Sequence, residues 1–249
     1  LNDEAGHCAA RPTSVNCLMA NDSVLLASQG YYESDSQFHN MVLVEDLEGT
    51  QGIQPGMKIS VPVLKDSPLA TYAVAEVENY MRWPMTLRRT YFFVKDRFMW
   101  VRDELDFKST FFARIGPCWL SRQLGPASGK DWVNTYFDSM PYTGLGQGNG
   151  HHKWRNTNYD LLTYCVPKPD MELTLSDLTT HNQFMNAPLR VRQTWRGLAK
   201  EGSTLVFDSL LIPHGVKYKE PDATWLAKTI KVQENTPEQT AVTFDMPNG

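Results

Sequence analysis

The fold is decided by residues 89–105, which read RTYFFVKDRFMWVRDEL. Aromatic and β-branched residues dominate both halves of this stretch, and residues 95–97 between them, KDR, are typical of a short turn. The pattern predicts two antiparallel strands joined by a hairpin. Residues 20–23, ANDS, indicate a second hairpin of the same kind nearer the start of the chain.

Short runs of similar composition recur along the whole chain, separated by Gly, Pro, Asn and Asp. Helical periodicity is nearly absent, and frequent prolines would interrupt most long helices. So many strands exceed what one open sheet comfortably holds, so we predict an all-β fold, a large two-layer antiparallel β-sandwich. The expected strands are 15–20, 24–28, 38–44, 58–64, 72–77, 87–94, 98–105, 161–166, 189–195, 204–212, 225–232 and 240–244.

We predict a single domain over residues 1–249, because no linker or shift of composition divides the strands. Residues 125–158 lack alternation and contain the run GLGQGNG at 144–150, so they are expected to form a long excursion from the scaffold. The chain begins at Leu1 rather than Met, which suggests that processing or a boundary has removed a preceding region.

Charge and hydropathy exclude some partners. The formal net charge is -4 with both signs interspersed, so we expect no nucleic-acid partner. No apolar run approaches the roughly 20 residues that span a bilayer, so we expect no membrane partner. Cys8 and Cys17 are close enough to bridge a hairpin, although buried free thiols are the reading that we favour for the cysteines.

Three sequence blocks occur in an order that resembles one known family. Residues 30–32, GYY, precede 38–44, FHNMVLV, in which a His-Asn pair opens a strand, and 49–51, GTQ, follow. Together with the hairpin at 89–105 and the run FDSLLIPHG at 207–215, these blocks resemble the heparinase II/III-like polysaccharide lyases.

The resemblance implies the C-terminal β-sandwich of an enzyme whose N-terminal helical toroid is supplied by another chain or a removed region. Such an enzyme is a lyase that cleaves uronic-acid-containing polysaccharide by β-elimination, and it is secreted or periplasmic. The implied partners are an acidic polysaccharide and the toroid. A non-catalytic carbohydrate-binding or assembly module on the same scaffold is the alternative.

The resemblance also implies site residues. His7 falls where the family has the catalytic histidine, and His suits proton transfer near neutral pH. A structural zinc would be bound at the positions of Ala9, Ser28 and His39, of which His39 alone is a ligand type. We therefore expect a degenerate metal site and no cofactor, with zinc as the alternative. A solvated terminal side chain is the competing reading for His7.

A cationic aromatic cluster follows the Gly-rich run. His151, His152, Trp154 and Arg155 combine a stacking surface with positive charge, which suits an acidic sugar. A mobile loop facing solvent is the competing reading. Most of the other tryptophans are expected to fill the core, because aromatic side chains supply much of the buried area in such folds. They are Trp83, Trp100, Trp119, Trp195 and Trp225.

Overall fold

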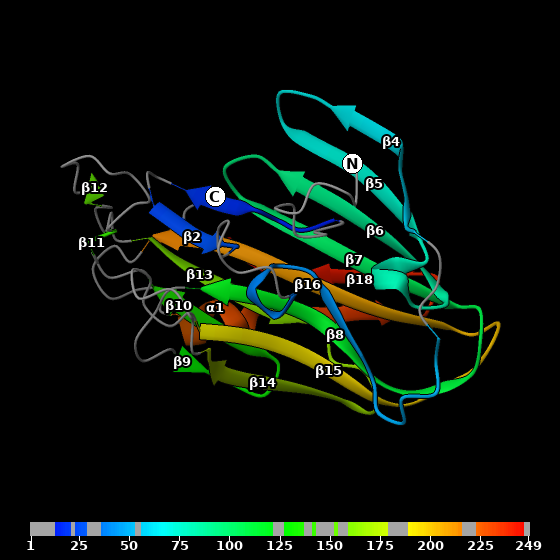
Figure 1. The fold of residues 1–249 in the computed structure, drawn as a ribbon. Helices are drawn as coiled ribbons and strands as arrows, with labels where there is room; N and C mark the ends of the chain where they lie inside the picture. The colour runs from blue at the N-terminus through cyan, green and yellow to red at the C-terminus, as the bar shows by residue number, and fades with distance from the viewer. Residues whose placement is uncertain are drawn as a thin grey trace.

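Two stacked antiparallel sheets form the body of the protein (Figure 1). The computed structural model describes residues 13–20, 23–28, 36–52, 56–121, 127–136, 141–142, 152–153, 159–178, 189–215 and 223–246. The predicted all-β sandwich is confirmed. Among the residues described, no helix has the length and apolar character needed to cross a membrane.

The larger sheet has eight strands and the smaller sheet has four. In spatial order the larger sheet contains β4 (Lys58–Asp66), β5 (Ala70–Glu78), β6 (Met85–Val94), β7 (Phe98–Phe107), β16 (Thr204–Gly215), β13 (Tyr159–Cys165), β10 (Trp132–Tyr136) and β9 (Ala127–Ser128). The smaller sheet contains β14 (Met171–Asp177), β15 (Leu189–Ala199), β8 (Phe111–Ser121) and β3 (Val42–Asp46).

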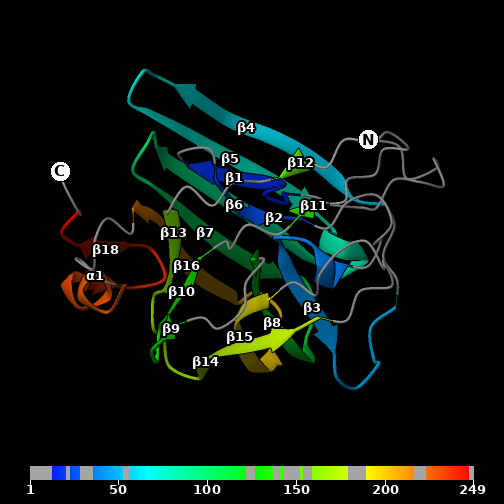
Figure 2. The same ribbon diagram turned by 90° about the vertical axis from the view of Figure 1, so that its left-hand side faces the viewer.

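Smaller elements complete the described structure. Three pairs of short strands are β1 (Cys17–Ala20) with β2 (Ser23–Ala27), β11 (Pro141–Tyr142) with β12 (His152–Lys153), and β17 (Lys231–Asn235) with β18 (Thr240–Thr243). The helical turns are η1 (Ser36–Phe38), η2 (Tyr80–Arg82) and α1 (Ala223–Thr229). Figure 2 shows α1 and β18 on the side of the larger sheet that faces away from the smaller one.

The core lies between the sheets, where alternate residues of each strand point inward. Leu87 and Leu105 of the larger sheet belong to one buried cluster with Ile115 of the smaller sheet. The outer face of the larger sheet has a core of its own, because Leu226 of α1 packs with Leu210 of β16. The C-terminal segment therefore covers this outer face.

The hairpin predicted at residues 89–105 is confirmed. The amide of Arg97 donates to the carbonyl of Val94 (3.1 Å), and Asp96 takes the left-handed conformation at φ 61°. Pairing continues from this turn along β6 and β7 as far as Met85 and Phe107.

Two of the predicted strands need correction. Residues 225–232 were expected to form one strand, but Ala223–Thr229 is α1 and the next strand begins at Lys231. The sequence ATWLAKT buries Ala223, Leu226 and Ala227, whose spacing of three and four residues makes one helical face. In the predicted strand 38–44, β3 begins only at Val42, so the histidine at 39 precedes the strand instead of opening it.

Several strands were not predicted, among them β8 and β14, and β9 and β10 lie within the expected excursion at 125–158. In β8, Gly116 and Pro117 interrupt the apolar pattern in sequence. The glycine has a structural reason, since a Cβ at position 116 would lie 1.7 Å from the backbone oxygen of Gln193 on β15. Close strand contact therefore requires glycine where the sequence rules suggest a break.

Candidate functional site

A fully buried ion pair lies on the inner face of the central hairpin. Arg89 of β6 is opposite Asp103 of β7 in the strand register, and both side chains have no exposed area. Nε and Nη2 of Arg89 donate to the two carboxylate oxygens at 2.5 and 2.9 Å. Burial by itself would lower the pKa of Arg89, but the charge and hydrogen bonds of Asp103 raise it above its usual value. The guanidinium remains a cation inside the sandwich.

This cation anchors the beginning of the described chain. Nη1 of Arg89 donates to the carbonyls of Thr13 (2.9 Å) and Asn40 (3.1 Å), and the hydroxyl of Tyr91 also donates to Thr13 (2.5 Å). Nδ2 of the Asn40 side chain donates to the carbonyl of Val15 (2.7 Å). Residues 13–15 are thus fixed against the inner face by charged and neutral hydrogen bonds.

The His-Asn pair contributes to this anchor mainly through its asparagine. Oδ1 of Asn40 accepts from the amide of Leu120 (2.6 Å), so this side chain links the first segment to the end of β8. His39 is fully buried beside it, and its backbone carbonyl accepts from the amide of Met41 (3.0 Å). The pair therefore occupies the interior of the sandwich.

The positions expected to bind zinc do not fit that ion in the part of the chain that the structure describes. Ser28 stands at one of these positions, and its hydroxyl lies 3.0 Å from the hydroxyl of Ser14 and accepts from the backbone amide of Asn40 (3.4 Å). No three His, Cys, Asp or Glu side chains gather among the described residues. A serine hydroxyl is a poor substitute for the nitrogen, sulfur or carboxylate ligands of structural zinc.

The other predicted site residues fall mostly outside the described structure. His7, His151, Trp154 and Arg155 lie among residues that are not described. The backbone of His152 is described in β12, where it pairs with Tyr142 of β11. Their assignment to catalysis and to sugar binding stays a prediction.

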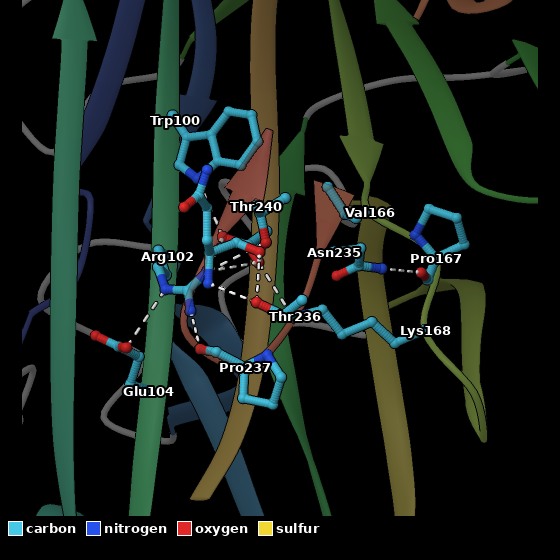
Figure 3. A network of polar contacts seen from close by, with 12 residues as sticks. Trp100, Arg102, Glu104, Val166, Pro167, Lys168, Asn235, Thr236, Pro237 and Thr240 are labelled. Atoms are coloured by element: carbon cyan, nitrogen blue, oxygen red, sulfur yellow. Dashed lines mark hydrogen bonds and ion pairs between the residues drawn. The ribbon is translucent and has the colours of Figure 1, made fainter. Parts of the chain in front are cut away.

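A second polar network lies on the outer face of the larger sheet. Side chains from β7, from the segment after β13 and from the β17–β18 hairpin converge there (Figure 3). Their common acceptor is the fully buried carboxylate of Asp208 on β16, which accepts from Trp100 Nε1 (3.1 Å), Arg102 Nη1 (3.2 Å), Lys168 Nζ (3.1 Å) and Thr240 Oγ1 (2.8 Å). Two cations thus share one buried carboxylate.

The same network fastens the C-terminal hairpin to the sheet. Arg102 donates through Nη2 to the carbonyl of Pro237 and forms an ion pair with Glu104 (3.4 Å). Asn235 donates to the carbonyl of Pro167 (2.8 Å), as Figure 3 also shows. The β17–β18 hairpin is therefore bound both to β7 and to the segment that follows β13.

A buried histidine lies near the other end of β16 on the same outer face. Nε2 of His214 donates to Oδ1 of Asn134 (2.6 Å), whose amide donates to Asp160 (2.8 Å). Nδ1 of His214 is buried and has no hydrogen-bond partner among the described residues, and burial lowers the pKa of this histidine to about 4. Burial also raises the pKa of Asp160, against the opposing effect of its hydrogen bond from Asn134. The imidazole is therefore neutral at pH 7.

The Arg89–Asp103 pair and the Asp208 network were both missed from the sequence, although the first of them left a signal there. Arg89 and Asp103 are charged residues at positions that alternate in phase with Leu87 and Leu105, which predicts inward charges opposite each other in a hairpin. Asp208 had no such signal, because Lys168 and the C-terminal hairpin reach it from distant parts of the sequence. Of the five tryptophans assigned to the core, Trp119 is fully buried, whereas Trp225 is 43% exposed.

Comparison with known proteins identifies the class of fold. Neither a protein-family model nor a curated protein sequence matches the chain. In three dimensions it is similar to solved heparinase III and heparan sulfate lyase structures. The resemblance inferred from the sequence blocks is thereby confirmed at the level of the fold.

The individual similarities are distant in sequence. A heparinase III structure gives a TM-score of 0.57 at 13% identity over 84% of this chain and 29% of that chain. The heparan sulfate lyase from Pedobacter heparinus gives 0.59 at 12% identity over 90% of this chain and 33% of that chain. A further heparinase III structure gives 0.52 at 14% identity over 81% of this chain and 26% of that chain. The chain thus spans about a third or less of each of these proteins.

Proposed function

We propose that this chain is the β-sandwich part of a polysaccharide lyase that cleaves uronic-acid-containing polysaccharide by β-elimination. The observation that carries the proposal is the similarity of its fold, over most of the chain, to heparinase III and heparan sulfate lyase structures. The anchor formed by Arg89 and Asn40 supports it, because it fixes residues 13–15 a few positions after His7.

The reaction needs three functions in one geometry: neutralisation of the uronate carboxylate, removal of the C5 proton and protonation of the leaving oxygen. In our proposal His7 transfers a proton, and His151, His152, Trp154 and Arg155 bind the acidic sugar. A helical toroid, in another chain or another part of the same protein, supplies the remaining groups. The site of action is secreted or periplasmic.

The alternative function is a carbohydrate-binding or assembly module without catalysis. Ser28 favours it, because a hydroxyl that hydrogen bonds to Ser14 stands where the family would have a zinc-binding carboxylate. A scaffold without the metal would still fold around the Arg89 anchor, since that anchor uses protein groups alone. The two functions therefore differ in activity and not in fold.

The deciding experiment follows the rise in ultraviolet absorbance as unsaturated uronate ends form. The isolated chain and its assembly with a helical toroid are assayed on a panel of uronate polysaccharides. We expect activity from the assembly alone, with a loss of about a hundredfold or more in kcat for His7→Ala. His181→Ala changes a histidine to which the proposal assigns no role, so this control should keep full activity.

Two results would contradict the proposal. Strong activity from the isolated chain would remove the requirement for a toroid. An active assembly that is indifferent to His7→Ala would remove this histidine from the mechanism and leave the domain as a scaffold.

A further inference from the structure

A pocket of about 250 Å³ opens beside the Asp208 network, at the end of β16 that lies away from His214. Met171, Trp195 and Leu205 contribute apolar walls to it. Lys168, Asn235 and Thr236 contribute polar groups. The pocket therefore combines an aromatic surface with hydrogen-bonding groups from two separate segments, which is the usual composition of a small-ligand site.

The indole of Trp195 has a position that a glycine makes possible. A Cβ at Gly197, two residues further along β15, would lie 2.6 Å from Cζ2 of Trp195. The indole therefore lies along its own strand in the space that the missing side chain leaves. Part of this tryptophan packs against the inner core, and part lines the pocket. Flat aromatic surfaces of this kind suit the apolar face of a sugar ring.

Backbone groups of β16 also point toward the pocket. The pairing of β16 with β13 ends at Ser209 and Cys165, and the carbonyl of Asp208 then accepts from the amide of Val166 (2.9 Å). Residues two apart in a strand direct their N–H and C=O groups to the same side. The groups of Val206, a pocket residue, therefore face the gap that β13 has left, and no described strand pairs with them there.

A cation stands at the margin of the pocket. Nζ of Lys168 donates to Asp208 (3.1 Å), the one acceptor found for it among the described residues, and its side chain is 12% exposed. Burial lowers the pKa of Lys168, and the carboxylate of Asp208 opposes this effect. An ammonium has three N–H donors, so this one can bind a further anionic group while it keeps Asp208.

We propose that this pocket binds one acidic sugar unit, with its ring against Trp195 and its carboxylate or sulfate at Lys168. The volume suits a single ring, since sites for larger ligands occupy roughly 300–1,000 Å³. The choice of an acidic sugar rests on the proposed function. The pocket itself is a separate site, because none of its residues is among those assigned to catalysis or to the loop at 151–155. It would hold a polysaccharide chain at a second point.

The test is a titration of the isolated chain with D-glucuronate and with D-glucose, followed by NMR of the indole N–H groups. We expect glucuronate to perturb the signal of Trp195, assigned by its loss in Trp195→Phe, with a dissociation constant on the order of 1 mM. Lys168→Gln should weaken glucuronate about tenfold and leave glucose unchanged. Denaturant unfolding of each variant establishes that it is folded.

Matched controls lie outside the pocket. Trp225→Phe removes a 43% exposed indole on α1, and Lys58→Gln removes a cation whose side chain is 81% exposed on β4. Neither should alter the affinity for glucuronate. The proposal is overturned by equal affinities for glucuronate and glucose, by no saturable perturbation of Trp195, or by an unchanged affinity in Lys168→Gln.

This test and the lyase assay fail independently. An inactive assembly whose sandwich still binds glucuronate at Trp195 would remove the lyase function and keep the pocket. An active lyase whose sandwich gives no response at Trp195 would remove the pocket alone.

Discussion

Arg102 and Asp103 are neighbours on β7, yet they belong to two networks on opposite faces of the sheet. Asp103 points inward to Arg89, and neither side chain has any exposed area. Arg102 points outward to Asp208, where the carboxylate is buried but the cation is 13% exposed. Strand alternation thus places one fully buried ion pair in the core and one partly exposed cluster under the C-terminal hairpin.

The difference bears on what each network can do. In the inner pair, one guanidinium donates to both carboxylate oxygens of Asp103 and also to the carbonyl of Thr13. The pair is therefore suited to hold residues 13–15 in a fixed position. The outer cluster brings two cations to one carboxylate and borders an open pocket. The inner network therefore stabilises the fold, whereas the outer one has donors left for a ligand.

The inner pair gives the largest expected effect on stability. Asp103→Asn leaves the charge of Arg89 buried without a counterion, so we expect the free energy of unfolding to fall by about 3–5 kcal/mol. Glu78→Gln is the control, because its partner Lys58 is on the surface and such pairs are worth at most about 1 kcal/mol. Urea unfolding measures both variants.

A double variant separates the charge from the packing. Arg89→Met with Asp103→Leu removes both charges, and it should be more stable than Asp103→Asn alone. If the single and double variants lose the same stability, the unpaired charge is not the cause.

On the outer face, His214 gives an effect that depends on pH. Its folded-state pKa of about 4 lies below the unfolded value of about 6.5, so the unfolded chain binds the proton more readily. The stability from this group is therefore complete above pH 6.5 and is lost as the pH falls toward 4, by roughly 3 kcal/mol at most. Asp160 has the opposite sign, because its raised pKa favours the folded state as the carboxyl becomes protonated.

Unfolding measured from pH 7 to pH 4 tests the histidine. His214→Gln keeps a donor for Asn134 but does not titrate, so its stability should vary less over this range than that of the wild type. An equal pH dependence in both proteins would assign the effect to other groups.

The same comparison explains how far the sequence could lead. The central hairpin was predictable because its strands and turn are adjacent in sequence, and the register then places Arg89 opposite Asp103. The outer cluster was not predictable, because it brings Asp208 together with Lys168 and Thr240 from distant parts of the chain. Such contacts depend on the strand order of the larger sheet, which local patterns do not specify.

The same limit applies to single elements. The helix Ala223–Thr229 was predicted as a strand because its Trp and Thr residues and the Ile that follows favour strands. Burial of one face against β13 and β16 favours the helix instead. Cys118 and Cys165 are buried thiols with pKa values raised to about 12, as expected for core cysteines, whereas Cys17 is exposed and does not follow that expectation. Composition predicts burial better than it predicts which sheet a residue joins.

Asp208→Asn is expected to have a smaller effect on stability than the changes at Asp103 and His214. The amide cannot balance Arg102 and Lys168, but both cations are near the surface and can be hydrated, so we expect a loss of about 1–3 kcal/mol. Because Thr240 also loses its carboxylate acceptor, the damage should concentrate in the C-terminal hairpin, where amides of Lys231–Asn235 should exchange with solvent faster than amides of β6. Glu104→Gln is the control, since its 28% exposed side chain contacts Arg102 alone within this cluster. Uniformly faster exchange across both sheets would mean that Asp208 stabilises the whole sandwich. The outer cluster would then not act locally, and its contrast with the inner anchor would be wrong.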